Sequence, residues 1–193
     1  GHKNNEGIYL GNLGNVYRLQ GQHNLAVEHY TQALDIAREV GDKGIEGNNL
    51  GNLGIVYKDQ GQYDLAVAHY NSALDIAREI GNKSNEGIYL GNIGDILFEQ
   101  NRLEEAEDVL RKSIFINNTA CPAAAGAFRA SLALLLAQKG QLDEALVLIE
   151  IGESLVVPYP IEHAKFLGKK GQVQHSACNL KAAQASLDQV KAL

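Results

Sequence analysis

The sequence predicts an all-α protein, built as a solenoid of about five helix pairs, and three observations support this fold class. The chain repeats itself every 40 residues, and about two-thirds of the positions in residues 1–40 are identical in residues 41–80. Apolar residues inside each repeat recur at helical spacing. The whole chain holds only three prolines. A fixed period of this length is typical of arrays in which each unit buries its apolar face against its neighbours.

Two helices account for the first repeat. The first carries Leu10 and Leu13 on one face and ends before Gly21, where a helix C-terminus needs a positive φ. The second covers about residues 24–40 and is closed by Gly41. The second repeat has the same signals 40 residues later.

The later repeats follow the same scheme with substitutions. In the third, Asn101 replaces the turn glycine. A fourth unit follows Pro122, and Pro158 and Pro160 end its second helix. The fifth is the weakest, with Cys178 at the place of the turn glycine. We therefore expect one solenoid domain over residues 1–193, with repeats at about 1–40, 41–80, 81–119, 120–158 and 159–193.

These positions resemble the tetratricopeptide repeat, in a long variant similar to the repeats of kinesin light chains and of G-protein-signalling modulators. Arg38 and Arg78 stand where the family has a proline. The resemblance implies a right-handed superhelix whose concave wall is lined by the first helix of each pair. The residues that carry it recur in both repeats: Leu10, Leu13, Gly14, Tyr17, Gly21, Ala26, Tyr30 and Ala33, then Leu50, Leu53, Gly54, Tyr57, Gly61, Ala66, Tyr70 and Ala73.

Composition excludes several classes of partner. The net charge of -6 argues against nucleic acid and anionic membranes, which need clustered Lys and Arg. The two cysteines, Cys121 and Cys178, do not form a disulfide framework, so we expect buried free thiols and a cytoplasmic location. A chain without Met is expected to be a fragment of a larger protein.

Asparagines in register give the sharpest functional signal. Asn12, Asn52 and Asn92 recur in three repeats although Asn is a poor residue for a helix interior. An amide both donates and accepts hydrogen bonds, so a row of amides can hold the backbone of an extended peptide. The alternative is that they only bond between neighbouring helices. A glycine precedes each one and would let the peptide approach closely: Gly11, Gly51 and Gly91.

Other positions of the first helices vary while the packing residues stay fixed. We expect this variable stripe to face the ligand as well. Its predicted members fall in two rows: Ile8, Asn48 and Ile88, and then Asn15, Ile55 and Asp95.

Two lysines of the fifth repeat fall on the same inner face. Lys165 and Lys169 match the places where some members of the family hold a peptide carboxylate, with Lys169 in the place of Asn12. The fourth repeat has Ser131 where that clamp needs Asn, so solvated lysines are the preferred interpretation. An acidic peptide segment remains an alternative partner.

Catalytic and metal sites are not expected. His29 and His69 occupy equivalent places in two repeats, but neighbouring helices pack about 8–10 Å apart, too far for easy joint ligation of a metal. No acid, base and nucleophile come together in the pattern. We expect neither a cofactor nor an enzyme.

The function we expect is therefore protein-protein interaction. A peptide segment of a partner, extended or partly helical, would lie in the concave groove, and the chain would act as a scaffold or regulatory domain. One alternative is a structural or self-assembling spacer whose repeat ends stack. Another is a sensor domain that controls a neighbouring domain outside this fragment. We expect the chain itself to be a monomer or to associate weakly end to end.

Overall fold

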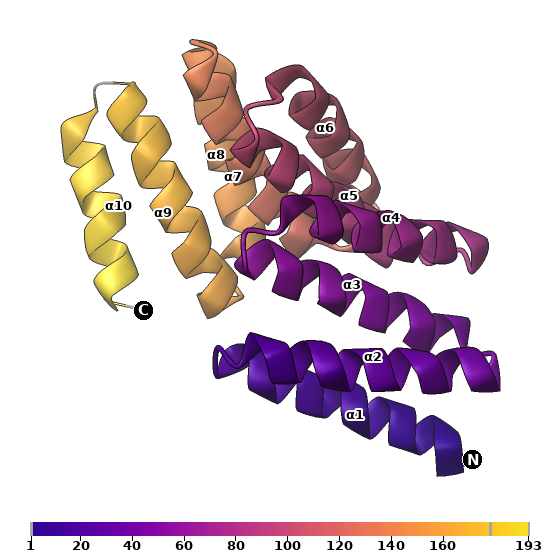
Figure 1. Cartoon of the computed structure of the whole chain (residues 1–193). Helices are drawn as coiled ribbons and strands as arrows, with labels where there is room; N and C mark the ends of the chain where they lie inside the picture. The colour runs from indigo at the N-terminus through magenta and orange to yellow at the C-terminus, as the bar shows by residue number, and fades with distance from the viewer. Residues whose placement is uncertain (1, 178, 193) are drawn as a thin grey trace. The chain divides into compact units, whose positions relative to one another are not determined.

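The computed structural model of the chain describes residues 2–177 and 179–192. Within these residues the protein contains ten α-helices and no β-strand, which confirms the predicted fold class (Figure 1). The helices follow one another in pairs: α1 (His2–Leu19) and α2 (His23–Val40), α3 (Lys43–Asp59) and α4 (Tyr63–Glu79), α5 (Lys83–Glu99) and α6 (Leu103–Ala120), α7 (Pro122–Gln138) and α8 (Leu142–Val156), and α9 (Pro160–Ser176) and α10 (Leu180–Ala192).

The turns inside the pairs use residues in the left-handed backbone region, as the sequence predicts. Gly21 has a φ of 72°, and the following N–H of Gln22 donates to the carbonyl oxygen of Tyr17 at 2.9 Å. Asn101, which replaces glycine in the third repeat, has a φ of 58°. Asn tolerates this region better than other non-glycine residues. The helix pair therefore keeps its sharp turn despite the substitution.

The chain divides into two compact units, Gly1–Tyr89 and Leu90–Leu193, and the boundary falls inside α5. In the first unit α1 packs against α2, α2 against α3, and α3 against α4. A Cβ atom on Gly14 would lie 2.7 Å from the ring of Tyr30, and one on Gly54 would lie 2.7 Å from the ring of Tyr70. Both rings are fully buried, so these glycines provide the space into which each ring packs.

In the second unit α7 is the central helix, because α6, α8 and α9 all pack against it. Its residues Leu132, Leu135 and Leu136 are fully buried. A Cβ atom on Gly126 of α7 would lie 2.8 Å from the carbonyl oxygen of Gly152 in α8. The two helix backbones therefore approach too closely for any side chain at this point.

The prolines break the helices where the sequence predicts. The helix α8 ends at Val156, and α9 begins at Pro160, which occupies the first turn. Among the helices of the described ranges, none combines the length and the apolar character that crossing a membrane requires.

Candidate functional site

The predicted asparagines all lie on first helices. In the first unit Asn12 is on α1 and Asn52 is on α3, and in the second unit Asn92 is on α5. Asn12 is exposed, and the other two are half-buried. None of the three amide groups hydrogen-bonds to any residue that the structure describes. The alternative of bonds between neighbouring helices thus gains no support, and ligand binding by these amides stays a prediction.

The glycines that precede the asparagines do not present open backbone, contrary to our expectation. A Cβ atom on Gly51 would lie 2.5 Å from the ring of Tyr89, and one on Gly91 would lie 2.2 Å from the ring of Phe128. Both glycines are buried. The expectation is therefore wrong for these two glycines, because an aromatic ring of the next first helix fills the space that a ligand backbone would need.

A hydrogen bond holds the ring of Tyr89 over Gly51. The Tyr89 hydroxyl donates to the carbonyl oxygen of Gly47 at 3.1 Å. Burial raises the pKa of Tyr89 to about 12, so the hydroxyl keeps its proton at neutral pH. At Gly11 the side chain of Asn49 takes the place of the ring, with its Oδ1 3.0 Å from an added Cβ atom. All three glycines thus face the next repeat rather than an open surface.

The variable stripe is partly engaged within the protein. Asn15 accepts a hydrogen bond from the hydroxyl of Tyr30 at 2.7 Å. Asn48 accepts one from the amide of Asn85 at 2.9 Å. These two amides therefore have intramolecular partners, unlike Asn12. The remaining apolar members of the stripe are exposed or half-buried: Ile8, Ile55 and Ile88.

The two lysines of α9 differ in their surroundings. Lys169 Nζ donates to Ser131 Oγ at 2.6 Å and lies 3.9 Å from Asp95 Oδ1. Lys165 Nζ lies 3.1 Å from Glu162, on its own helix, and 68% of the Lys165 side chain is exposed. Lys165 is thus largely exposed to solvent, whereas Lys169 has partners on two other helices, and ligand binding by either lysine stays a prediction. Ser131, Lys169 and Asp95 form a polar cluster of three first helices within the second unit.

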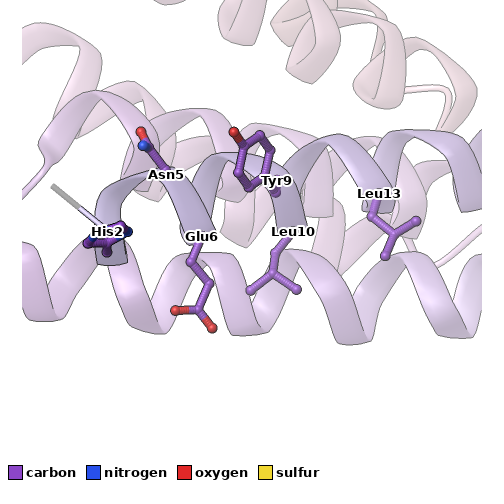
Figure 2. Close-up of a pocket in the computed structure, with 6 residues that line it drawn as sticks. All are labelled: His2, Asn5, Glu6, Tyr9, Leu10 and Leu13. Atoms are coloured by element: carbon purple, nitrogen blue, oxygen red, sulfur yellow. The ribbon is translucent and has the colours of Figure 1, made fainter.

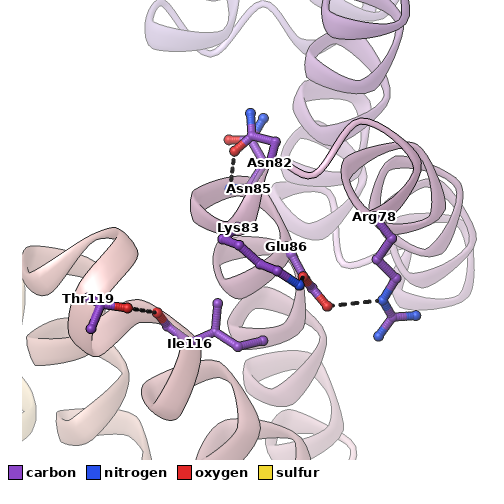
Figure 3. A network of polar contacts seen from close by, with 7 residues as sticks. All are labelled: Arg78, Asn82, Lys83, Asn85, Glu86, Ile116 and Thr119. Carbon is purple, nitrogen blue, oxygen red and sulfur yellow. Dashed lines mark hydrogen bonds and ion pairs between the residues drawn. The ribbon is translucent and has the colours of Figure 1, made fainter.

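Our sequence analysis missed a second recurring contact, between an arginine at the end of one pair and a glutamate at the start of the next. Arg78 Nε donates to Glu86 Oε1 at 3.2 Å, and Lys83 Nζ donates to the other oxygen of this carboxylate at 2.6 Å (Figure 3). Arg38 reaches Glu46 in the same way, at 3.1 Å. The signal was present, because both residues of each pair recur at the 40-residue period.

The two equivalent histidines stack on tyrosines instead of facing each other. His29 stacks on Tyr17 and His69 on Tyr57, each with ring centroids 5.1 Å apart. No cluster of three or more His, Cys, Asp or Glu side chains with metal-binding geometry occurs in the described ranges. Cys121 is half-buried rather than buried as we expected, and Cys178 lies outside the described residues.

Family models now identify the repeats. A tetratricopeptide repeat model matches residues 5–79 and 46–116, and a second one matches residues 126–150. Together the matches cover more than half of the chain. The chain belongs to the tetratricopeptide repeat family. This fold is typical of protein-protein interaction modules and is generally a non-enzymatic scaffold.

Solved structures of low sequence identity share the fold. BtubC (BKLC) from P. vanneervenii matches with a TM-score of 0.74 at 20% identity, over 94% of this chain and 77% of that one. A putative kinesin light chain of Podosopora anserina, described as nearly identical TPR-like repeats, matches with a TM-score of 0.72 at 18% identity, over 100% and 95%. A Rap protein complexed with Competence and Sporulation Factor matches with a TM-score of 0.83 at 18% identity, over 98% and 54%.

These identities show the fold alone. This chain spans about half the length of the Rap protein. A search of curated protein sequences finds no match.

Proposed function

We propose that this chain is an interaction module that holds a peptide segment of a partner protein, extended or partly helical, along the face of its first helices. The observation that carries the proposal is the set of three in-register amides that form no hydrogen bond with a described residue: Asn12, Asn52 and Asn92. Asn costs roughly half a kcal/mol relative to Ala in a helix interior. No described residue uses these amides, so they are available to a ligand, and binding one gives a reason for keeping Asn at these places.

The chemistry of the surrounding face agrees with a peptide ligand. An amide can pair with both the N–H and the carbonyl of an extended backbone, so it binds without demanding a particular ligand sequence. The apolar Ile8 and Ile55 beside the amides supply contacts for ligand side chains. In the fifth repeat Lys169 stands in the place of the amide and favours a polar or acidic ligand residue. The fold is also the one in which a Rap protein is complexed with its factor.

The test compares two sets of Asn→Ala substitutions in the whole chain. Peptides are first selected from a random library on the immobilised protein, and their dissociation constants are measured by fluorescence anisotropy. Replacing Asn12, Asn52 and Asn92 together should weaken binding at least about tenfold, since three hydrogen bonds to the ligand are lost. The melting temperature should stay the same or rise, because Ala is the better helix former.

A matched control carries the same change on second helices, where Asn24 and Asn71 are exposed. Replacing both with Ala should leave binding unchanged. If the triple variant melts much earlier than the parent protein and still binds the selected peptides, the amides are structural and the proposal fails.

A further inference from the structure

Asn15 is held by a buried tyrosine of the same repeat. The hydroxyl of Tyr30, on α2, donates to Asn15 Oδ1, on α1, at 2.7 Å. Tyr30 is fully buried, and its ring fills the space over Gly14. A ring packed in this way has little room to move. Its hydroxyl is therefore a fixed point that orients the amide of Asn15.

Arg18 determines which end of the amide meets the tyrosine. Burial raises the pKa of Tyr30 above its usual value of 10.0, and a hydrogen bond from Arg18 opposes this change to a smaller extent. A guanidinium has only donors, so Arg18 faces the hydroxyl oxygen, and the hydroxyl proton needs another acceptor. Asn15 Oδ1 is that acceptor, since a buried O–H without one is costly.

The nitrogen of the same amide is left available. No described residue accepts a hydrogen bond from Asn15 Nδ2. Asn15 is half-buried, as are Ile55 and Asp95, which hold the same place in the next two repeats. Those two repeats have described helices on both sides, so this degree of exposure is a property of the position in the repeat.

Asn15 lies on a different face of α1 from the hollow in Figure 2, where Leu10 and Leu13 point to one side. Asn15 follows Leu10 by five residues, so it lies about 140° further round the helix axis. Asn12 precedes Asn15 by three residues and is its neighbour on the same face. The hollow is lined by His2, Asn5, Glu6, Tyr9, Leu10 and Leu13.

The charges near Asn15 are balanced. Arg18 Nη1 lies 3.9 Å from Asp59 Oδ2, on α3. The cation beside Tyr30 is therefore matched by a carboxylate of the same unit. A ligand carboxylate would lose its hydration here without gaining an unmatched positive charge. A neutral carbonyl oxygen is thus the acceptor that suits Asn15 Nδ2.

We propose that Tyr30 is a positioning residue of the peptide site, which fixes the amide of Asn15 so that Nδ2 donates to a backbone carbonyl oxygen of the ligand. This inference rests on the proposed function and adds which ligand atom the first repeat recognises. Asn12 can pair with an N–H or with a carbonyl, whereas Asn15, held by Tyr30, offers the ligand a donor. In the second repeat Ile55 stands in this place and makes an apolar contact instead.

Two substitutions in the whole chain test the proposal, with the peptides selected from the random library on the parent protein as probes. Asn15→Asp keeps the shape and the acceptor for Tyr30 but removes the donor, so it should weaken peptide binding at least about tenfold. Tyr30→Phe keeps the ring and removes only the hydroxyl. The amide can then turn, and binding should weaken by roughly two- to fivefold. Fluorescence anisotropy below the melting temperature of each variant measures both effects.

Tyr70→Phe is the matched control in the second repeat. Tyr70 is also fully buried, with its ring over Gly54. Its repeat has Ile55 in the place of Asn15, so there is no amide at that place to orient. Tyr70→Phe should therefore leave peptide binding unchanged. Equal losses of binding in Tyr30→Phe and Tyr70→Phe would overturn the proposal.

A double variant separates positioning from a purely structural role of Tyr30. In the Asn15→Ala background, Tyr30→Phe should cause no further loss of binding, because no amide is left to orient. A structural role would weaken binding by the same factor in both backgrounds, against the proposal. NMR gives a second measurement. The Nδ2 protons of Asn15, identified by their loss in Asn15→Asp, should shift when peptide is added, and unchanged resonances would contradict the proposed hydrogen bond.

The outcomes also distinguish this proposal from the proposed function. If the triple variant of Asn12, Asn52 and Asn92 loses peptide binding while Asn15→Asp binds as the parent protein does, only the positioning proposal fails. If the library yields no peptide that binds the parent protein, the proposed function fails and the positioning proposal fails with it.

Discussion

Glycines in the first helices are of two kinds, according to what lies over them. The ring of Tyr89 covers Gly51, whereas no neighbouring atom lies within 4 Å of a Cβ atom placed on Gly168. In an uncovered helix position, Ala is favoured over Gly because it restricts the unfolded chain. Under a packed ring the added methyl group instead forces the ring to move. The same substitution therefore has opposite effects at the two positions.

We expect Gly51→Ala to lower the free energy of unfolding by about 1–3 kcal/mol, because the Tyr89 ring is buried and hydrogen-bonded and cannot move freely. Gly168→Ala should raise this free energy by about 0.4–1 kcal/mol. Urea titration of both single variants measures the two values. If Gly51→Ala is as well tolerated as Gly168→Ala, the ring of Tyr89 does not fill this site in solution.

A histidine makes stability depend on pH. Burial, and secondly the charge of Arg38, lower the pKa of His69 below its usual value of 6.5. The unfolded chain thus takes up this proton at a higher pH than the folded chain. The contribution of His69 to stability is complete above about pH 6.5, decreases as the pH falls below that value, and levels off below the folded-state pKa.

In the variant His69→Gln the free energy of unfolding should fall less as the pH decreases, because glutamine does not titrate. Urea titrations at several pH values between about 8 and 5 measure this free energy. Most carboxylates remain ionised in that range. Superimposable stability curves for the parent protein and the variant would show that His69 does not contribute.

Between helix pairs, an ion pair takes the place of the family's proline. Arg38 and Arg78 stand at that position, and the second helices continue until each arginine reaches a glutamate of the next helix. The hydrogen bond from Lys83 lowers the pKa of Glu86, burial opposes this change, and Arg78 adds to the lowering. The carboxylate is therefore held in its charged form although it is nearly buried.

Glu86→Gln should lower the free energy of unfolding by about 1–2 kcal/mol, because a charged acceptor with two cationic partners is lost from a nearly buried place. Glu6→Gln is the matched control and should be close to neutral, since Glu6 is exposed and lacks an arginine partner. Thermal unfolding followed by circular dichroism compares the two. A neutral Glu86→Gln would mean that packing alone joins the repeats.

Most of the elements could be predicted from the sequence, because glycines and prolines mark many of the helix boundaries. Gly21 and Gly41 close their helices with positive φ values, and Pro160 starts α9. The contacts between repeats could not be predicted in the same way. Whether Gly51 faces a ligand or the ring of Tyr89 depends on how one first helix lies against the next, and no local pattern specifies this. The hydrogen bond from Tyr30 to Asn15 was missed because it depends on how α2 lies against α1 within one repeat, which no local pattern specifies either.

In the molecule as a whole, stability should follow the number of neighbours that each repeat has. Repeat arrays gain much of their stability from interfaces between adjacent units, so an end unit with one neighbour is less stable than an interior one. Among the described residues, Val16 of α1 is 47% exposed where Val56 of α3 is fully buried, and Leu13 is 38% exposed where Leu53 is 2% exposed, so two identical pairs of side chains sit in the two surroundings. They allow the contribution of a neighbouring repeat to be measured inside one protein.

We therefore expect backbone amides of α1 to exchange with deuterium faster than those of α3, because local opening of α1 exposes less apolar surface that was buried. Hydrogen exchange followed by mass spectrometry measures both helices in the same sample. If α1 exchanges as slowly as α3, its exposed face does not weaken it, and a neighbouring helix contributes little to the stability of a first helix in this chain.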